Sequence, residues 1–132
     1  MAKTIEQKVS FNVSPNRLFN IYMDAKLHGA AINSSVIIKK KTGASFSAFN
    51  GYVRGKNLLI VPNRLIVQSW RGKEWEKNDA DSILVLSFEK ARHGALLHMV
   101  HSNVPDHIAA KIKKGWNEYY WKPWKRYLKE RR

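Results

Sequence analysis

The chain has 132 residues, 44% of them hydrophobic, and a formal net charge of +14 at pH 7. This hydrophobic content excludes an intrinsically disordered chain, and the length fits one domain over residues 1–132. There is no cysteine, which excludes disulfides, thiolate metal sites and cysteine nucleophiles. The N-terminus has no apolar signal region and no apolar run approaches the roughly 20 residues of a membrane span, so we expect a cytoplasmic protein without membrane contact.

The first part of the chain predicts one strand followed by two short helices. Residues 4–12 alternate apolar and polar side chains, which is typical of a strand with one buried face. Ser14 and Pro15 form a helix start, with serine as the N-cap and proline at the first helical position. Asp24 caps a second helix over residues 25–31, and we expect the two helices to close one end of a sheet.

Six more strand-type runs follow, at residues 36–40, 45–49, 52–61, 65–71, 82–90 and 95–102. With the first strand they predict a curved antiparallel sheet of about seven strands. Asn50 and Gly51 supply turn chemistry between two of the runs. A polar loop over residues 72–81 contains Trp75, which we expect to be exposed.

One long helix over residues 106–129 closes the chain, with apolar residues recurring every three to four positions. Pro123 has no amide hydrogen, so it should bend this helix or thin its hydrogen bonds. We expect the helix to lie across the concave face of the sheet with Trp116 and Tyr120 buried. The predicted fold class is therefore α+β.

The central and C-terminal parts of the chain carry four motifs: Phe46-x-x-Phe49-x-Gly51-x-Val53-x-Gly55, Ile66-Val67-Gln68-x-Trp70-Arg71, Val104-Pro105 and Gly115-Trp116-x-x-Tyr119-Tyr120-Trp121-x-Pro123. In this order they resemble the activator of heat-shock protein 90 ATPase family, within the START-like (SRPBCC) superfamily. The resemblance covers nearly the whole chain and is greatest to the C-terminal domain of the family's eukaryotic co-chaperone. It implies a helix-grip fold, with a sheet curled around the long C-terminal helix and room for an interior cavity.

No catalytic constellation is recognisable, so we expect a non-enzymatic protein without cofactor or metal. The serines lack a Gly-x-Ser-x-Gly elbow, and no carboxylates pair inside an apolar run. His98 and His101 are three apart on a predicted strand, so they point to opposite faces and cannot form a two-histidine metal site. We interpret His101 as a hydrogen-bonded core residue. Arg71 is expected to pair with an acidic residue at the sheet surface.

Apolar and aromatic residues that should face the C-terminal helix form the candidate pocket: Trp70, Leu84, Leu86, Phe88, Leu97, Met99, His101, Trp116 and Tyr120. The pattern favours a filled core slightly over a cavity with a few polar groups, which is the expected ligand site of such a fold. The second alternative predicts a carrier or sensor of a small hydrophobic ligand.

Basic residues are concentrated at the C-terminal end of the chain, where nine Lys and Arg follow Val104 against three acidic residues. The candidate partner-binding residues are Lys113, Lys114, Lys122, Lys125 and Arg126. The leading hypothesis is a co-chaperone-like module that binds a heat-shock protein 90 homologue or another acidic protein. A weaker alternative is electrostatic nucleic-acid binding. Helical spacing predicts that the aromatics pack onto the sheet, which disfavours a nucleic-acid partner.

Overall fold

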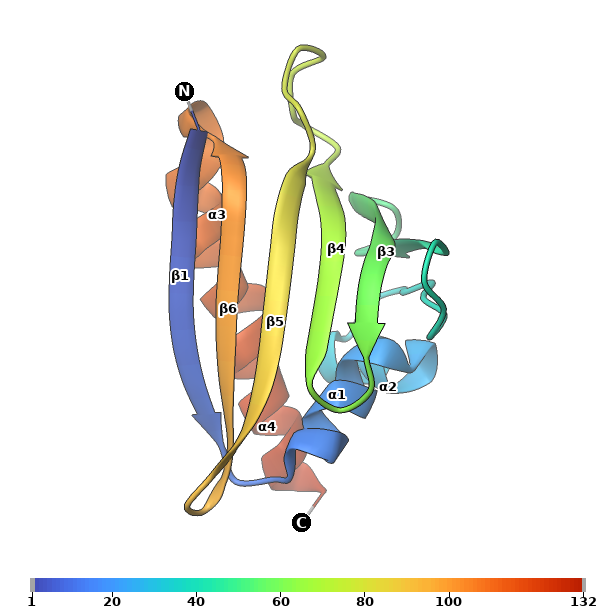
Figure 1. The fold of residues 1–132 in the computed structure, drawn as a ribbon, viewed down its shortest axis with the longest axis vertical. Helices are drawn as coiled ribbons and strands as arrows, with labels where there is room; N and C mark the ends of the chain where they lie inside the picture. Colours follow the sequence, from blue (N-terminus) through green and yellow to red (C-terminus); the bar gives the residue numbers. More distant parts are fainter. Residues whose placement is uncertain (1, 132) are drawn as a thin grey trace.

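An antiparallel sheet, covered by helices on one face, organises the chain (Figure 1). The computed structural model describes residues 2–131. In chain order the strands are β1 (Ala2–Phe11), β2 (Ser45–Ala48), β3 (Val53–Val61), β4 (Leu65–Gly72), β5 (Ser82–Ala91) and β6 (Gly94–Pro105). In space they lie in the order β1-β6-β5-β4-β3-β2. The predicted α+β architecture is confirmed, with a sheet of six strands rather than seven.

The missing seventh strand is the run predicted at residues 36–40, and that prediction was wrong. Only one isolated bridge forms there, between Ile37 and Ser47. Farther along, the side-chain amide of Asn57 donates to the carbonyl oxygens of Lys39 at 2.8 Å and Lys41 at 3.1 Å. These carbonyls are taken up by a side chain, so this part of the segment joins no strand ladder.

The two short helices are α1 (Pro15–Met23) and α2 (Ala25–Ile32), and their starts follow the predicted caps. The Ser14 hydroxyl accepts a hydrogen bond from the Arg17 amide at 3.2 Å, and the Asp24 carboxylate accepts from Leu27 at 3.0 Å. Helix α1 buries its apolar stripe against the end of β5, where Phe19 meets Phe88 edge-on at 5.7 Å between ring centroids.

The C-terminal helical segment is continuous but changes its hydrogen bonding along its length. A 3₁₀ turn, η1 (Asp106–Ile108), leads into α3 (Ala109–Trp116), a π-helical turn η2 (Asn117–Trp121) and α4 (Lys122–Glu130). The Lys122 amide donates to the carbonyl of Asn117, five residues earlier. Pro123 follows at once and has no N–H to donate, so the wider turn falls beside the proline, in line with the predicted thinning of hydrogen bonds.

The core lies between the concave face of the sheet and the helices. Trp116 is 3% exposed and Tyr120 is 4% exposed, which confirms the predicted position of the C-terminal segment. Trp121 reaches β1, where its indole N–H donates to the Gln7 side chain at 2.7 Å. Within residues 2–131 no helix has the length and apolar character needed to cross a bilayer.

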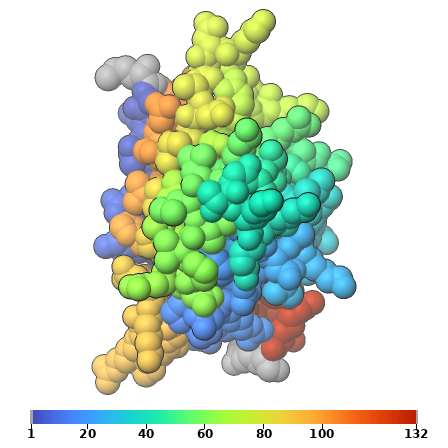
Figure 2. All heavy atoms as spheres, turned by 45° about the vertical axis from the view of Figure 1, so that its right-hand side comes forward, coloured from blue at the N-terminus to red at the C-terminus, as the bar shows by residue number. Residues whose placement is uncertain are grey.

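The β4–β5 loop and the β5–β6 hairpin project from opposite ends of the molecule (Figure 2). The loop lies at the end of the sheet where α3 begins, whereas the hairpin lies near α4 (Figure 1). The loop can therefore contact the start of the C-terminal helical segment, and the hairpin cannot.

Candidate functional site

A cavity of about 330 Å³ lies between the sheet and the C-terminal helical segment and opens to the surface. The turn before β3, the strands β3 and β4, the β4–β5 loop, α3 and the π-helical turn all contribute to its wall. The lining residues are Phe49, Tyr52, Val53, Trp70, Glu74, Lys111, Ile112, Gly115, Trp116, Tyr119 and Tyr120. We call this space the aromatic cavity, because six of its eleven lining residues are aromatic.

Ring contacts hold the wall of the aromatic cavity. Trp116 lies 4.8 Å from Tyr120 and 6.1 Å from Trp70 between ring centroids. Phe49 meets Tyr120 edge-on at 5.6 Å. Phe49 has a φ of +52°, in the left-handed region that non-glycine residues rarely adopt, and the turn continues through Asn50. This turn directs the Phe49 ring toward the helix.

The mouth of the cavity carries one charged pair. The Lys111 ammonium donates to both carboxylate oxygens of Glu74, at 3.0 and 3.2 Å. The Tyr52 hydroxyl also donates to Glu74. The bonds from Tyr52 and then Lys111 lower the pKa of Glu74, so this carboxylate is charged at neutral pH. Desolvation, followed by the Glu74 contact, raises the pKa of Tyr52 to about 12.

Of the nine candidate pocket residues, Trp70, Trp116 and Tyr120 line the aromatic cavity. The structure does not bring the other six to its wall: Leu84, Leu86, Phe88, Leu97, Met99 and His101 are all in the buried core. They alternate along β5 and β6 on the concave face, which the helices cover closely. Sequence reasoning missed the turn residues and the mouth, because it took the ligand surface to be the middle of the sheet.

His101 is a satisfied core residue, as predicted. Its Nδ1 accepts from the indole N–H of Trp116 at 3.0 Å, which leaves the proton on Nε2. That Nε2–H donates to Ser82 Oγ at 2.8 Å, and the Ser82 hydroxyl donates to the carbonyl of Trp70. Burial lowers the pKa of His101 to about 3, so the ring is neutral. His98 lies on the opposite face, 2.6 Å from Glu6, which confirms the predicted alternation.

His28 is a second buried histidine, which sequence reasoning missed. Its Nδ1–H donates to the Tyr22 carbonyl at 2.7 Å, and its Nε2 accepts from the Tyr120 hydroxyl at 3.0 Å. Burial lowers its pKa to about 4. The bond to Tyr120 ties α2 to the wall of the aromatic cavity. Nothing local in the sequence marks His28 as buried, because its partners lie on other helices and Tyr120 is 92 residues away along the chain.

A series of buried, hydrogen-bonded side chains runs from Tyr22 into the sheet. The Tyr22 hydroxyl donates to Gln68 at 2.7 Å, and the Gln68 amide donates to Asn57 at 2.8 Å. Asn57 in turn holds the segment before β2, as described above. These side chains therefore join α1, β4 and β3 through satisfied hydrogen bonds, which fixes the backbone behind the cavity.

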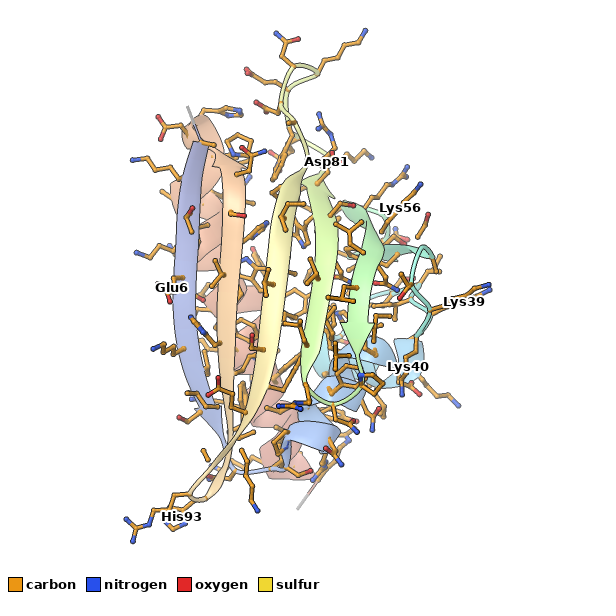
Figure 3. All side chains as sticks on the ribbon, viewed as in Figure 1. Glu6, Lys39, Lys40, Lys56, Asp81 and His93 are labelled. Atoms are coloured by element: carbon orange, nitrogen blue, oxygen red, sulfur yellow. The ribbon has the colours of Figure 1, made fainter. Side chains whose placement is uncertain are left out.

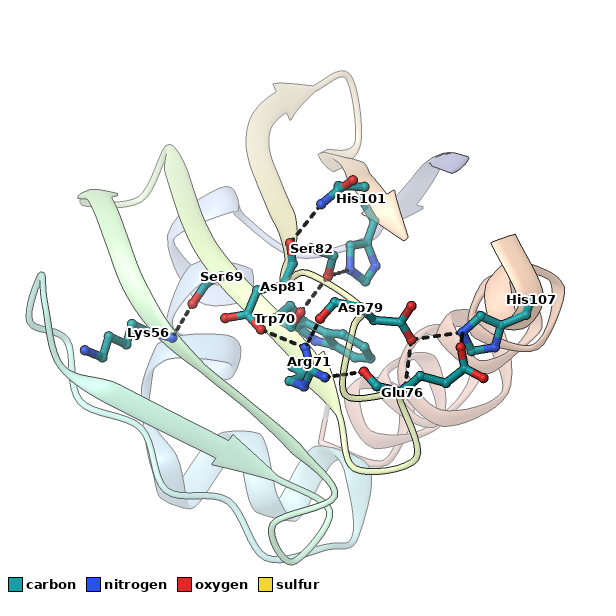
Figure 4. A network of polar contacts seen from close by, with 11 residues as sticks. Lys56, Ser69, Trp70, Arg71, Glu76, Asp79, Asp81, Ser82, His101 and His107 are labelled. Carbon is teal, nitrogen blue, oxygen red and sulfur yellow. Dashed lines mark hydrogen bonds and ion pairs between the residues drawn. The ribbon is translucent and has the colours of Figure 1, made fainter. Parts of the chain in front are cut away.

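Arg71 organises the β4–β5 loop (Figure 4). Its guanidinium lies 3.3 Å from the carboxylate of Asp81 and donates to backbone carbonyls of Glu76 and Asp79, which confirms the predicted acidic partner. The expectation that Trp75 is exposed was wrong. It is 6% exposed, because its ring packs over Gly72 and lies 5.7 Å from the Trp70 ring.

Glu76, Asp79 and His107 bring three potential metal-ligating atoms within 4.8 Å of one another, the one such group in residues 2–131. These groups are already hydrogen-bonded to one another. Asp79 accepts from His107 Nε2 at 2.9 Å and from the Glu76 amide at 2.8 Å. The adjacent Arg71 guanidinium opposes a bound cation. We interpret the group as an ion pair that fastens the loop to η1.

The loop contact predicts a pH-dependent contribution to stability. The hydrogen bond to Asp79 raises the pKa of His107, and the same bond lowers the pKa of Asp79. A raised histidine pKa stabilises the fold below about pH 6.5 and ceases to do so as pH rises through the folded value. His107→Gln should therefore lower the melting temperature more at about pH 5.5 than at about pH 8.5. Thermal unfolding of the variant and of the unmodified protein at these two pH values measures the difference. An equal loss at both would mean that charge plays no part.

The basic residues predicted to bind a partner are all exposed on the C-terminal helical segment: Lys113, Lys114, Lys122, Lys125 and Arg126. We call these five residues the basic surface. Lys122 pairs with Glu118 at 3.3 Å, whereas none of the other four has an acidic partner within residues 2–131. The aromatics beside them are mostly buried, as predicted, and Tyr119 is the exception at 62% exposed.

A protein-family model described as "Activator of Hsp90 ATPase homolog 1-like protein" matches residues 12–129. Among curated proteins, the "Activator of 90 kDa heat shock protein ATPase homolog" of Dictyostelium discoideum is 24% identical over 86% of this chain and 30% of its own length. The human "Activator of 90 kDa heat shock protein ATPase homolog 1" is 26% identical over 88% of this chain and 34% of its own length. The chain therefore spans about a third of the length of these relatives.

Solved structures support the same fold. An HSP90 activator from Plasmodium falciparum superposes with a TM-score of 0.85 at 24% identity, covering 97% of this chain and 96% of that one. A protein from Mesorhizobium loti superposes with a TM-score of 0.84 at 16% identity, covering 97% and 98%. At these identities the likeness concerns the fold and not the site.

Proposed function

The chain belongs to the family of activator of Hsp90 ATPase homolog 1-like proteins, and from this premise we propose that it is a non-enzymatic module that binds an Hsp90 homologue. The observation that carries the proposal is the basic surface on the C-terminal helical segment. It presents five exposed cations, four of them without an acidic partner in the described part of the chain. An acidic patch on the chaperone is the complementary partner.

The arrangement of the aromatic side chains favours a protein partner over nucleic acid. Single-stranded nucleic acid binds to platforms of exposed rings between cations. Trp116, Tyr120, Trp121 and Trp124 are instead at most 4% exposed, and they pack against the sheet and α1. Tyr119 is the one ring of this segment that is largely exposed, at 62%, and a single ring is no stacking platform. Cations with so few accessible rings fit electrostatic steering toward an acidic protein surface.

The proposal predicts strongly salt-dependent binding that requires the basic surface. Lys113→Glu combined with Lys125→Glu should weaken binding to a purified cytosolic Hsp90 homologue by about tenfold at low salt, or about 1.4 kcal/mol. Because exposed charges are screened over a Debye length of about 8 Å at physiological salt, affinity of the unmodified protein should fall as salt rises. Titration calorimetry at several salt concentrations measures both effects.

A matched control uses the lysines beside β3, where Figure 3 labels Lys39 away from the C-terminal helical segment. Lys39→Glu combined with Lys41→Glu makes the same change in net charge at exposed positions. If the basic surface is the contact, this control should keep most of the affinity. Equal weakening by both double variants would show that only net charge matters, and absence of any binding at low salt would overturn the proposed function.

A further inference from the structure

We propose that the outer edge of β3 over residues 58–61 binds an extended peptide of aliphatic residues followed by acidic residues, which adds to the sheet as an antiparallel strand. β2 pairs only with residues 53–56, so β3 continues past β2 with one side unpaired. Addition of a strand to such an edge is a common mode of peptide recognition. We call residues 58–61 the free edge. It shares no residue with the basic surface, so the proposal is independent of chaperone binding.

Backbone hydrogen-bonding groups remain available along the free edge. Within residues 2–131 its backbone partners are β4 and the turn residue Arg64. The Val61 carbonyl accepts from the Arg64 amide at 3.0 Å, which places the groups of Val61 on the side of β4. Because this direction alternates along an antiparallel ladder, the amide and carbonyl of Ile60 point outward. A register shift in the β3–β4 ladder also leaves Leu58 without a partner on β4.

The two edges of the sheet differ in their protection against strand addition. At the opposite edge, β1 exposes the charged side chains of Lys3, Glu6 and Lys8, and such charges oppose the pairing of another strand. The free edge instead reads Leu-Leu-Ile-Val, and its two leucines are each 46% exposed. The edge that lacks charged protection is therefore both apolar and accessible.

The surroundings of the free edge are cationic. Residues 25–73 contain nine Lys and Arg and no acidic residue. The Asn57 side chain donates to the carbonyls of Lys39 and Lys41, so both lysines lie where the free edge begins. Figure 3 labels Lys39 and Lys56 on the same side of the molecule, beside β3. We call Lys39, Lys41 and Lys56 the edge lysines; all three are exposed, and none has an acidic partner in the described part of the chain.

The position of these cations gives the direction of the occupant. All five strand pairings in the sheet are antiparallel. A strand added antiparallel to β3 begins beside Val61 and ends beside Leu58. Its C-terminal end therefore meets the three edge lysines, whereas Arg64 is the one cation of the adjoining turn. Aliphatic residues followed by acidic residues match the apolar edge and the lysines in this order.

A second copy of the chain does not fit this edge. Each copy has a net charge of +14, so two copies repel each other. Pairing two free edges about a twofold axis would also bring the edge lysines of one copy toward Arg64 of the other. An acidic peptide meets no such repulsion, so charge selects a different molecule as the occupant.

The test compares two synthetic peptides with blocked ends, by titration calorimetry against the full chain at low salt. The forward peptide has four alternating valines and threonines followed by three glutamates, and the reversed peptide has the glutamates first. The forward peptide should bind one molecule per chain and at least about fivefold more tightly than the reversed one. Equal affinities would overturn antiparallel addition, because charge alone would then determine binding.

Matched charge variants locate the peptide. Lys39→Glu combined with Lys41→Glu should weaken binding of the forward peptide by at least about tenfold, whereas Lys113→Glu combined with Lys125→Glu, on the basic surface, should weaken it by less than about threefold. Circular dichroism shows whether both variants fold. Equal weakening would overturn the location. Because chaperone binding should respond to these variants in the opposite order, failure of one proposal is distinguishable from failure of the other.

Amide hydrogen exchange of the unmodified protein gives a readout that needs no variant. The outward-facing amide of Ile60 should exchange at least about tenfold more slowly when the forward peptide is saturating, while the β1 amides keep their rates. An Ile60 amide that stays unprotected while the peptide binds would overturn strand addition. Protection that rises with protein concentration in the absence of peptide would overturn the choice of occupant in favour of a second copy. Binding to phosphatidylserine vesicles without binding of the forward peptide would overturn it in favour of a lipid surface.

Discussion

Gly55→Ala should destabilise the protein by more than about 4 kcal/mol, which is most of the roughly 5–15 kcal/mol that holds a domain of this kind together. A Cβ on Gly55 would lie 1.8 Å from the carbonyl oxygen of Ser69 and 2.7 Å from the Phe46 ring. The first of these atoms belongs to the backbone of β4. It cannot move aside without separating β3 from β4 beside the aromatic cavity.

Urea unfolding followed by tryptophan fluorescence measures this loss, provided that the variant folds at all. The matched control is Gly115→Ala, at a helical position where the new Cβ would make only ordinary contact with the Tyr119 ring, at 3.5 Å; it should be neutral or stabilising by about 0.5–1 kcal/mol. If Gly55→Ala were as stable as this control, the close approach of β3 and β4 would be wrong. A soluble but non-cooperative Gly55→Ala variant would agree with the prediction.

This close approach explains why Phe46 and Gly55 occur together in the motif of the central strands. They are cross-strand partners in β2 and β3, and the Phe46 ring covers the place where Gly55 has no side chain. The sequence predicted both strands and the turn between them from alternation and from Asn50 and Gly51. It could not predict the partnership, because spacing along the chain does not determine register.

Most of the fold was predictable because it follows local rules. Ser14 and Asp24 cap the two short helices, and the C-terminal helical segment was recognisable from its apolar spacing and from Pro123. The strand predicted at residues 36–40 had a suitable apolar run. However, the side-chain amide of Asn57, which is distant in the sequence, donates hydrogen bonds to two of the backbone carbonyls there. That competition depends on tertiary structure, which no local pattern reveals.

The candidate site was less predictable than the fold. Trp70, Trp116 and Tyr120 were identified from the motifs, but Glu74 and Lys111 come from segments that meet only after folding. Exposed charged residues are common, so neither one stands out in the sequence. His28 was missed for a similar reason, since both of its hydrogen bonds join it to elements outside its own helix.

The two buried histidines should make the protein unusually sensitive to mild acid. Burial lowers the pKa of His28 to about 4 and that of His101 to about 3, whereas a histidine in the unfolded chain has a pKa of about 6.5. Below about pH 6.5 these two histidines are therefore protonated in the unfolded chain and neutral in the folded chain. Their contribution to the free energy of unfolding is fully present above this pH, and it decreases as the pH falls toward the pKa values of the folded state.

Each histidine should remove about 1.4 kcal/mol of unfolding free energy per pH unit, so the pair removes about 2.7 kcal/mol per unit between about pH 6 and pH 4.5. The exposed His107 opposes this trend, because its pKa is raised, but solvent screens its ion pair. Glu74 and Asp79 have lowered pKa values in the fold, and they cost stability only where the unfolded carboxylates take up protons, near and below about pH 4.5. The window above pH 4.5 therefore reports mainly on His28 and His101.

Urea unfolding at a series of pH values measures the slope directly, and His93→Gln is the matched control. His93 is exposed in the hairpin between β5 and β6, at the bottom of Figure 3, so the control should keep the slope of the unmodified protein. His28→Gln should lower stability at neutral pH, because the bonds to Tyr22 and Tyr120 are disturbed, and should roughly halve the slope. A free energy of unfolding that stays constant between pH 6 and pH 4.5 would contradict the prediction, because buried neutral histidines cannot avoid this linkage. A constant free energy of unfolding would require both imidazoles to be protonated inside the fold. The hydrogen bonds that their ring nitrogens accept, from the Trp116 indole N–H at His101 and from the Tyr120 hydroxyl at His28, oppose this protonation.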